Sequence, residues 1–329
     1  MKSKWTGFHS PLDTGLQAFL EHKRALGCRF QTEEMTLRLF DRFLIEQQVT
    51  TIDTISPALV DTFLASRKRA SPQSYNHRLQ TLARAFQWLR ALGLIRASPV
   101  RAKPRRTTRT RIPFLFDPAA ARKLLEVAGS LPQCSSTPLR APAYRTIFAL
   151  LYALGLRVGE VARLRVGDFD MRRQLLTVRD TKFTKSRLVP FGPRLATLLT
   201  NYIQRLSQQQ GSLAETMPLF SFRKRQPVHP SVISQTFHEL VPRLGLCVPD
   251  GTAPPTVHCL RHSFAVSTLL RWYRSGVDPN SRLLQLSTFL GHVNPNSTAV
   301  YLTVTTALLA QANQRFERWA SPLIEEVTP

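Results

Sequence analysis

The feature that most constrains the fold of this chain is an interruption of its apolar periodicity between residues 97 and 113. Apolar residues recur at helical spacing on both sides, but within this segment prolines and basic residues replace them. The basic residues are Arg101, Lys103, Arg105, Arg106, Arg109 and Arg111. A chain of 329 residues also exceeds the usual size of a single core. The sequence therefore predicts two domains joined by a basic linker, residues 101–113.

Residues 1–100 are predicted to form a helical domain. The clearest of its four predicted helices begins at Ser71-Pro72, where serine can accept a hydrogen bond from the first turn and proline fits the first helical position. Its apolar residues step by three and four positions: Leu79, Leu82, Phe86 and Leu89. Such spacing places them on one face of a helix. We expect the four helices to bury one common core.

Residues 114–329 are predicted to form a second, larger domain. Most of its periodic segments are helical, but residues 174–179 and 186–190 read as two strands around a polar turn that holds Lys182 and Lys185. The predicted fold class is therefore mainly α with a small antiparallel β-sheet.

The charge of the chain favours a polyanionic partner. Lysine and arginine total 45 against 21 acidic residues, a formal net charge of +24. A membrane surface is the competing polyanion, but no apolar run approaches the ~20 residues of a spanning helix. We therefore expect a soluble, cytoplasmic protein that binds nucleic acid. The four cysteines show no CxxC spacing, so neither a zinc site nor a disulfide framework is expected.

A tyrosine near the C-terminus is the candidate for covalent chemistry. Tyr301 follows His292 by nine residues, and the pair His258 and Arg261 lies upstream. A phenol has a pKa of about 10, so only about one in a thousand is ionised at neutral pH, and a nucleophilic tyrosine needs basic or cationic neighbours. Because His258 and Arg261 are three residues apart, they project from one helical face if the helix begins at or before His258. The pattern suggests DNA cleavage through a tyrosine link.

The order and context of these residues resemble the tyrosine recombinase family, which includes Xer recombinases, phage integrases and transposon-encoded integrases. The resemblance spans roughly residues 10–310, is strong in the C-terminal domain and is only architectural in the N-terminal one. It rests on Leu154-Gly155-Leu156-Arg157-Val158-Gly159-Glu160, Lys182, His258-x-x-Arg261-His262-Ser263-Phe264-Ala265, Leu290-Gly291-His292 and Tyr301. It implies a helical core-binding domain that contacts DNA and a tyrosine-recombinase catalytic domain.

The resemblance also implies a role for each motif residue. Arg157 and Arg261 would hold the phosphate, whose developing charge suits forked donors, and Tyr301 would attack it to form a 3′-phosphotyrosine. The other catalytic candidates are Lys182 as general acid, His258 as acceptor of the tyrosine proton and His292 as a contact to a nonbridging oxygen, with Glu160 in support. Lys185 lies in the same turn and remains an alternative to Lys182. Neither a metal nor ATP or another cofactor is expected. His262 reads as a packing or surface histidine.

The expected partners are double-stranded DNA and further copies of the chain. The family implies a dimer on one site and a tetramer on two sites, and an accessory recombinase or directionality factor is a further candidate. A predicted helix after Tyr301 would dock on a neighbouring protomer or pack on its own domain. The basic linker is expected to contact DNA phosphates.

Three other functional classes are compatible with parts of this pattern. A type IB topoisomerase-like strand relaxer uses a similar set of residues, but a separate helical N-terminal domain and modest length favour a recombinase. A catalytically silent DNA-binding or architectural protein would not need every active-site position filled. A metal-dependent nuclease would need a carboxylate cluster, and Asp168, Asp170 and Asp180 are too scattered to suggest one.

Overall fold

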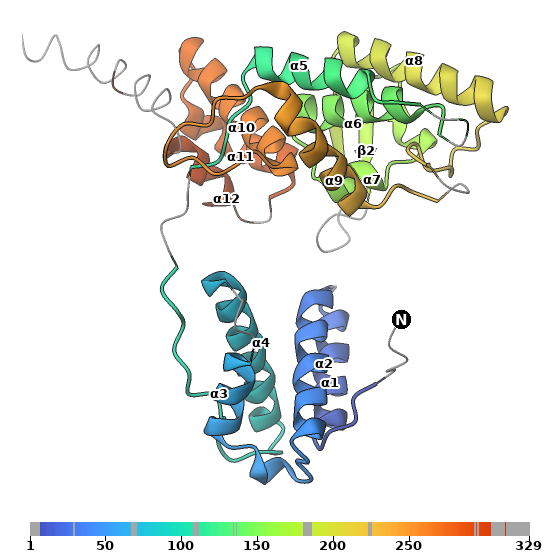
Figure 1. The fold of residues 1–329 in the computed structure, drawn as a ribbon. Coiled ribbons are helices and arrows are strands. Elements are labelled where there is room, and N and C mark those ends of the chain that lie inside the picture. Colours follow the sequence, from blue (N-terminus) through green and yellow to red (C-terminus); the bar gives the residue numbers. More distant parts are fainter. Residues whose placement is uncertain are drawn as a thin grey trace, which may run out of the picture. The chain divides into compact units, whose positions relative to one another are not determined.

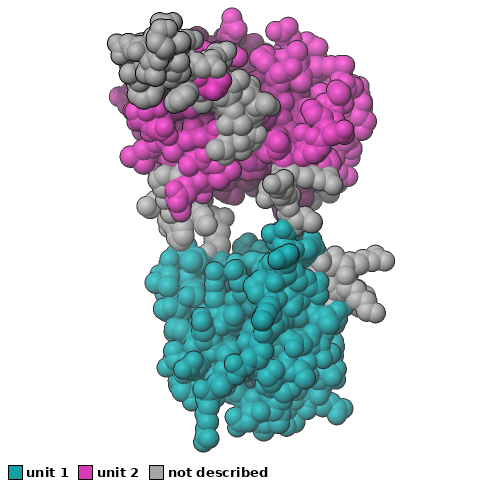
Figure 2. All heavy atoms as spheres, turned by 90° about the vertical axis from the view of Figure 1, so that its left-hand side faces the viewer, with its two compact units in different colours: residues 1–110 teal, residues 111–329 magenta. Residues whose placement is uncertain are grey.

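The computed structural model describes residues 7–28, 30–66, 71–107, 112–133, 135, 137–179, 186–222, 226–292, 294, 296–303 and 313. The chain divides into two compact units, Met1–Thr110 and Arg111–Pro329, shown in different colours in Figure 2. Each unit has its own apolar core. Within the described ranges, no helix is long and apolar enough to cross a membrane.

The first unit is helical (Figure 1). Its described helices are α1 (Asp13–Ala25), α2 (Gln31–Glu46), α3 (Pro57–Ala65) and α4 (Pro72–Ala91), with a short 3-10 turn at Ile52–Thr54. Phe40 is fully buried at the centre, with its ring centroid 5.0 Å from that of Phe63 and 6.0 Å from that of Phe86. The predicted cap is present, because the Ser71 hydroxyl accepts a hydrogen bond from the backbone N–H of Ser74 at 3.2 Å.

The beginning of the predicted linker is attached to α4. The side-chain amide of Asn76 accepts from the backbone N–H of Arg105 at 2.7 Å and donates to its carbonyl at 2.8 Å. The Arg105 guanidinium carbon lies 3.9 Å from the centroid of the Tyr75 ring. Arg101, Lys103 and Arg106 are exposed. Arg109 and Arg111, the remaining basic residues predicted for the linker, lie outside the described residues. Contact of this segment with DNA phosphates remains a prediction.

The second unit combines helices with a small sheet. The described helices are α5 (Pro118–Gly129), α6 (Arg140–Leu154), α7 (Val158–Ala162), α8 (Pro193–Gln210), α9 (Pro230–Leu240), α10 (Val257–Arg274), α11 (Pro279–Leu290) and α12 (Asn296–Ala299), with 3-10 turns η2 (Val166–Asp168), η4 (Val241–Leu244) and η5 (Val300–Thr303). Helix α6 packs against α5, α8 and α10 and is buried along most of its length.

Three short antiparallel strands lie in the order β1 (Phe169–Asp170), β2 (Leu175–Val178) and β3 (Arg187–Pro190). Leu176 pairs with Val189, and both are fully buried. These strands match the two that the sequence predicts and add the short β1. The predicted fold class, mainly α with a small antiparallel sheet, is confirmed.

A glycine turn connects α6 to α7. Gly155 ends α6 with φ +58°, in the left-handed region that glycine adopts most readily. A Cβ atom at this position would lie 2.6 Å from Phe264 and 3.0 Å from Leu290. The tight turn brings Arg157, which precedes the first residue of α7, close to α10 and α11.

Substitution of two glycines by alanine distinguishes the free energy lost through backbone strain from that lost through overpacking. Gly155 and Gly245 share φ +58°, but a Cβ at Gly245 would meet only the Lys123 amine, at 3.8 Å. Gly245→Ala should lower the free energy of unfolding by about 1 kcal/mol through backbone strain. Gly155→Ala should lower it by about 2–4 kcal/mol, because overpacking adds to the strain. Urea unfolding followed by circular dichroism measures both, and equal losses would contradict the packing argument.

Candidate active site

Arg157 is oriented by contacts to two different elements. Its Nη1 donates to Oε1 of Glu160 at 2.8 Å, and its backbone N–H donates to Oε2 of the same carboxylate at 2.9 Å. Its Nη2 donates to the carbonyl of Gly291, just after α11, at 2.9 Å. The side chain is 34% exposed. These hydrogen bonds therefore orient the guanidinium of Arg157, while part of its side chain faces solvent.

Glu160 is the buried carboxylate at the centre of this arrangement. Its side chain is 3% exposed and also accepts from Nη1 and Nη2 of Arg187, at 3.0 and 2.9 Å. Burial alone would raise the pKa of Glu160, but the hydrogen bonds and charges of Arg187 and Arg157 outweigh it and lower this pKa to about 2. The residue is a carboxylate at neutral pH and neutralises part of the positive charge around it.

Arg261 is buried between the ends of two helices. It is 1% exposed, and it donates from Nη1 to the carbonyl of Gly155 at 2.6 Å and from Nη2 to the carbonyl of Leu290 at 2.8 Å. Carbonyls at helix C-termini carry partial negative charge, which favours a cation. Burial, followed by the charge of Arg157, lowers the pKa of Arg261 to about 10, so this guanidinium is still protonated at neutral pH.

The end of α11 binds three arginines through three consecutive carbonyls. Phe289 accepts from Nε of Arg187 at 2.8 Å, and the next two carbonyls, described above, accept from Arg261 and Arg157. Gly291 has φ +69°, and a Cβ there would lie 2.7 Å from Nη1 of Arg187. The Leu-Gly-His motif thus has a structural explanation: the helix must end here so that its last carbonyls face the arginines.

Tyr301 lies in η5, in the same unit as these arginines. Its side chain is buried, and its hydroxyl oxygen is 2.9 Å from Nδ1 of His262. Burial raises the pKa of the Tyr301 hydroxyl, while the charges of Arg261 and Arg157 act in the opposite direction. Burial outweighs these charges, so the pKa of Tyr301 is raised and its phenol is protonated at neutral pH, while the two guanidiniums reduce the size of this rise.

Two further histidines line the site. His292 places Nδ1 2.6 Å from the Thr298 hydroxyl, and its ring stacks at 6.4 Å from that of Tyr301. His258 is exposed in the first turn of α10, with its ring edge-to-face on that of His262 at 4.5 Å. Although His258 as a whole residue is exposed, its ring packs on that of His262, and desolvation of this ring, followed by the charges of Arg261 and Arg157, lowers the pKa of His258. Burial, followed by the charges of Arg261 and Arg157, lowers the pKa of His292 to about 4. His292 is accordingly neutral at pH 7.

The structure brings most of the predicted site residues together. They are Arg157, Glu160, His258, Arg261, His292 and Tyr301. Lys182 and Lys185 fall in residues 180–185, outside the described residues, so the choice between them as general acid remains open. In the part of the chain that the structure describes, no group of three or more histidine, cysteine, aspartate or glutamate side chains could hold a metal ion.

The sequence did not indicate two residues that contact the candidate active site, His262 and Arg187. His262 was interpreted as a packing or surface histidine, yet it contacts the Tyr301 hydroxyl. Its spacing of four residues from His258 was the available signal, because residues i and i+4 share a helical face. Arg187 has no motif of its own. It begins β3 next to the exposed Leu188, and only the fold shows that it turns inward to Glu160.

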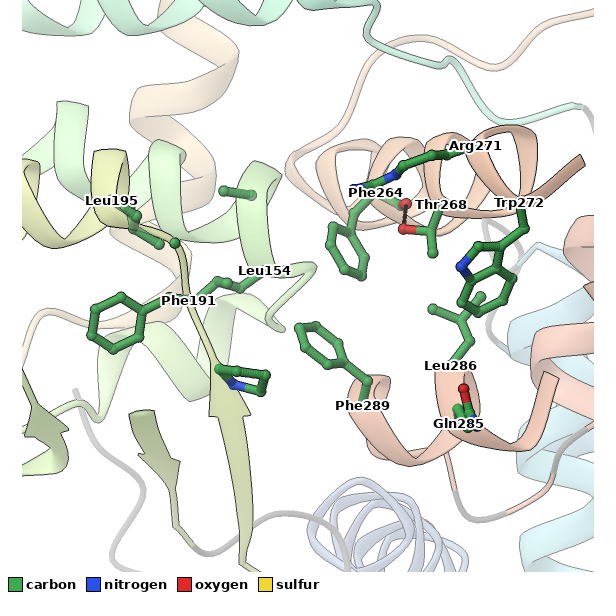
Figure 3. Close-up of a pocket in the computed structure, with 13 residues that line it drawn as sticks. Leu154, Phe191, Leu195, Phe264, Thr268, Arg271, Trp272, Gln285, Leu286 and Phe289 are labelled. Atoms are coloured by element: carbon green, nitrogen blue, oxygen red, sulfur yellow. Dashed lines mark hydrogen bonds between the residues drawn. The ribbon is translucent and has the colours of Figure 1, made fainter. Parts of the chain in front are cut away.

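An apolar pocket of about 520 Å³ lies beside the site (Figure 3). Phe264 and Phe289 line it, and their rings stack with centroids 5.2 Å apart. None of the predicted catalytic residues lines this pocket. The candidate active site is instead the charged cluster around Arg157 and Tyr301.

Comparison with known proteins identifies relatives across most of the chain. Residues 117–307 match the model of the phage integrase family. The integrase/recombinase y4rB of Sinorhizobium fredii is 34% identical over 92% of this chain and 96% of its own length. A tyrosine recombinase of Pseudothermotoga lettingae is 27% identical over 89% of this chain and 88% of its own.

Two solved structures share the fold at low sequence identity. The Tn1549 transposon integrase in complex with a circular intermediate DNA superposes with a TM-score of 0.64 at 18% identity, covering 92% of this chain and 99% of that one. A lambda integrase dimer bound to a core site gives a TM-score of 0.59 at 19% identity, covering 88% and 76%.

The lowered pKa of Glu160 predicts a pH-dependent contribution to stability. A carboxyl whose pKa is lower in the folded state stabilises the fold above its ordinary pKa of 4.5, and this stabilisation is lost as the pH falls towards about 2. Glu160→Gln should therefore lower the free energy of unfolding by about 3 kcal/mol at pH 7 and by less at pH 3. Urea unfolding at both pH values measures the difference. The exposed Glu126→Gln is the matched control, and a pH-independent loss in Glu160→Gln would contradict the argument.

Proposed function

This chain belongs to the phage integrase family and is a site-specific tyrosine recombinase, and we propose that Tyr301 is its nucleophile and that Arg157 and Arg261 bind the phosphate it attacks. The observation that carries this proposal is the position of the Tyr301 hydroxyl within electrostatic range of both guanidiniums, whose charges oppose the rise in its pKa that burial causes.

The proposed reaction exchanges one phosphate ester for another. The Tyr301 oxygen forms a bond to phosphorus, the bond from phosphorus to the 5′-oxygen breaks, and a 3′-phosphotyrosine results. Negative charge that builds on the nonbridging oxygens is stabilised by guanidinium donors. The departing 5′-oxygen needs a proton, for which Lys182 is the candidate and Lys185 the alternative. A 5′-hydroxyl from another strand reverses the step, and the phosphotyrosine retains the bond energy.

Preorganisation of the arginines supports this role. Arg157 and Arg261 are both oriented by hydrogen bonds to carbonyls at the end of α11. Donors that are already oriented need little rearrangement when charge develops, which is the main source of electrostatic catalysis. His292, whose ring stacks on Tyr301, is proposed to contact a nonbridging oxygen, and His258 lies at the exposed edge of the same site.

Double-stranded DNA is the proposed substrate and partner. The net charge of +24 suits a polyanion. Among the structural neighbours, the Tn1549 integrase is in complex with DNA and lambda integrase is a dimer on a core site. By analogy, we propose that this chain binds DNA as a dimer on one site. From the family resemblance, we further propose a tetramer on two sites, action in the cytoplasm, and an accessory recombinase or directionality factor as a further partner. The segment after Tyr301 that would dock in cis or in trans lies almost entirely outside the described residues.

Covalent capture tests the proposal. A nicked suicide duplex built from DNA that flanks the native gene should give a slowly migrating protein–DNA band on a denaturing gel, in excess EDTA, with wild type and not with Tyr301→Phe. The nick lets the cleaved end diffuse away and traps the adduct. Tight binding without a covalent band on any flanking fragment would favour a catalytically silent DNA-binding protein, and an unchanged band from Tyr301→Phe would exclude this nucleophile.

Salt dependence tests the role of the linker. Each phosphate contact contributes about 0.9 to the slope of log affinity against log salt. Removing the exposed pair Arg101 and Lys103 by substitution with Gln should lower the slope by about 2 in fluorescence anisotropy titrations of a random duplex. The control replaces Arg194 and Arg205 of α8, which are also exposed, and changes the net charge equally. Equal slopes for the two double variants would contradict specific contact by the linker.

A further inference from the structure

We infer that His262 is the group that takes the proton from Tyr301 as this tyrosine attacks DNA, and that His258 acts further out, towards the substrate. The inference rests on the proposed function, because it requires Tyr301 to be the nucleophile. It differs from the sequence prediction, which assigned the proton to His258.

The contact with the phenol belongs to His262. Its Nδ1 lies 2.9 Å from the Tyr301 hydroxyl oxygen, within the range for direct proton transfer. Both residues are described, and no hydrogen bond joins His258 to Tyr301 among the described contacts. The contact therefore favours the second histidine of α10 as the immediate proton acceptor.

The rings of His258, His262 and Tyr301 lie in a row, and their exposure to solvent decreases in that order. His258 is exposed, His262 is partly buried and Tyr301 is 5% exposed. The ring centroids are 4.5 Å apart for the two histidines and 5.4 Å apart for His262 and Tyr301. Both histidines project from one face of α10, one turn apart, so the helix fixes their separation. His258 is thus placed to meet a phosphate, and His262 to meet the nucleophile.

His262 is neutral at pH 7, as a proton acceptor must be, but its lowered pKa makes it a weak base unless a nearby negative charge raises that pKa. Burial, then the charges of His258 and Arg261, lowers the pKa of His262 to about 4, so the ring is neutral at pH 7. With its proton on Nε2, the ring offers the Nδ1 lone pair to the Tyr301 hydroxyl. A DNA phosphate would bring negative charge beside these cations and shift this pKa upward, which makes His262 a stronger base once substrate is bound.

The proton and electrons balance over the step. The O–H bond of Tyr301 breaks, its proton moves to Nδ1 of His262, and its electron pair stays on the oxygen, which bonds to phosphorus. The bond to the 5′-oxygen breaks with its electrons on that oxygen, which takes a proton from the general acid, for which Lys182 is the proposed candidate. In the reverse reaction, Nδ1 returns the proton to the tyrosine oxygen.

A purely structural role for His262 would also explain its contact with Tyr301. Lowering the pKa of the phenol by fluorination distinguishes a structural role from proton acceptance. The amide of asparagine can occupy the position of Nδ1 and keep a hydrogen bond, but it cannot accept a proton at neutral pH. A fluorinated tyrosine at position 301 ionises more readily and needs a base less. If His262 accepts the proton, fluorination should rescue His262→Asn, whereas it would not repair a misplaced ring.

The experiment measures the single-turnover rate of covalent adduct formation on the suicide duplex. His262→Asn and the matched His258→Asn are each prepared with tyrosine and with difluorotyrosine at position 301. His262→Asn should slow adduct formation at least about 100-fold, the usual contribution of a general base. In His262→Asn, difluorotyrosine at position 301 should raise the rate of adduct formation at least tenfold. It should not raise this rate in wild type or in His258→Asn. Unchanged DNA affinity and unfolding temperature show that each variant is folded, and His262→Gln repeats the test if His262→Asn does not fold.

Three outcomes would overturn the inference. An unimpaired His262→Asn would show that this ring is not the acceptor, and an impaired variant that difluorotyrosine does not rescue would show a structural role. Rescue of His258→Asn in place of His262→Asn would return the role to His258. In all three outcomes wild type still forms its adduct and Tyr301→Phe does not, so the proposed function stands. Loss of the adduct in wild type would instead remove the proposed function and the inference together.

Discussion

The candidate active site depends on how one buried carboxylate and one helix end hold a cluster of like charges. Arg157, Arg187 and Arg261 all contact the last turn of α11, and Glu160 bridges the first two. Guanidiniums this close repel one another, and their removal from water carries a desolvation cost. The Glu160 carboxylate and three consecutive backbone carbonyls offset both costs. The cluster keeps a net positive charge, and that remaining charge is available to a phosphate.

This arrangement explains why the site is built from helix ends. Gly155 ends α6 with its carbonyl on Arg261, and Gly291 ends α11 with its carbonyl on Arg157. Both glycines have positive φ, and both would clash with a neighbour if they carried a Cβ atom. The packing beneath them orients the guanidiniums. Tyr301 is buried where the charges of Arg261 and Arg157 act on its hydroxyl, so the proposed nucleophile depends on the same network.

Much of this could be predicted from the sequence, and the exceptions share a physical cause. Helical spacing and the strand pair around residues 180–185 predict the fold class, because local periodicity determines both. Arg261 and Tyr301 were predicted from their spacing together with the resemblance to the tyrosine recombinase family, and their roles remain predictions. Arg187 was missed because its partner Glu160 lies 27 residues away in the sequence, in helix α7. The backbone carbonyls that bind the arginines were missed because every residue carries one, so only the fold shows which of them converge.

The central claim is that Tyr301 becomes covalently linked to DNA within this cluster. The most direct measurement is to trap the protein–DNA adduct, digest it with nuclease and protease, and locate the nucleotide-bearing peptide by mass spectrometry. The chain has six tyrosines, so the position is informative. We expect a 3′-linked nucleotide on Tyr301 alone and a free 5′-hydroxyl on the released strand. A nucleotide on another residue, or a 5′-linked adduct, would contradict it.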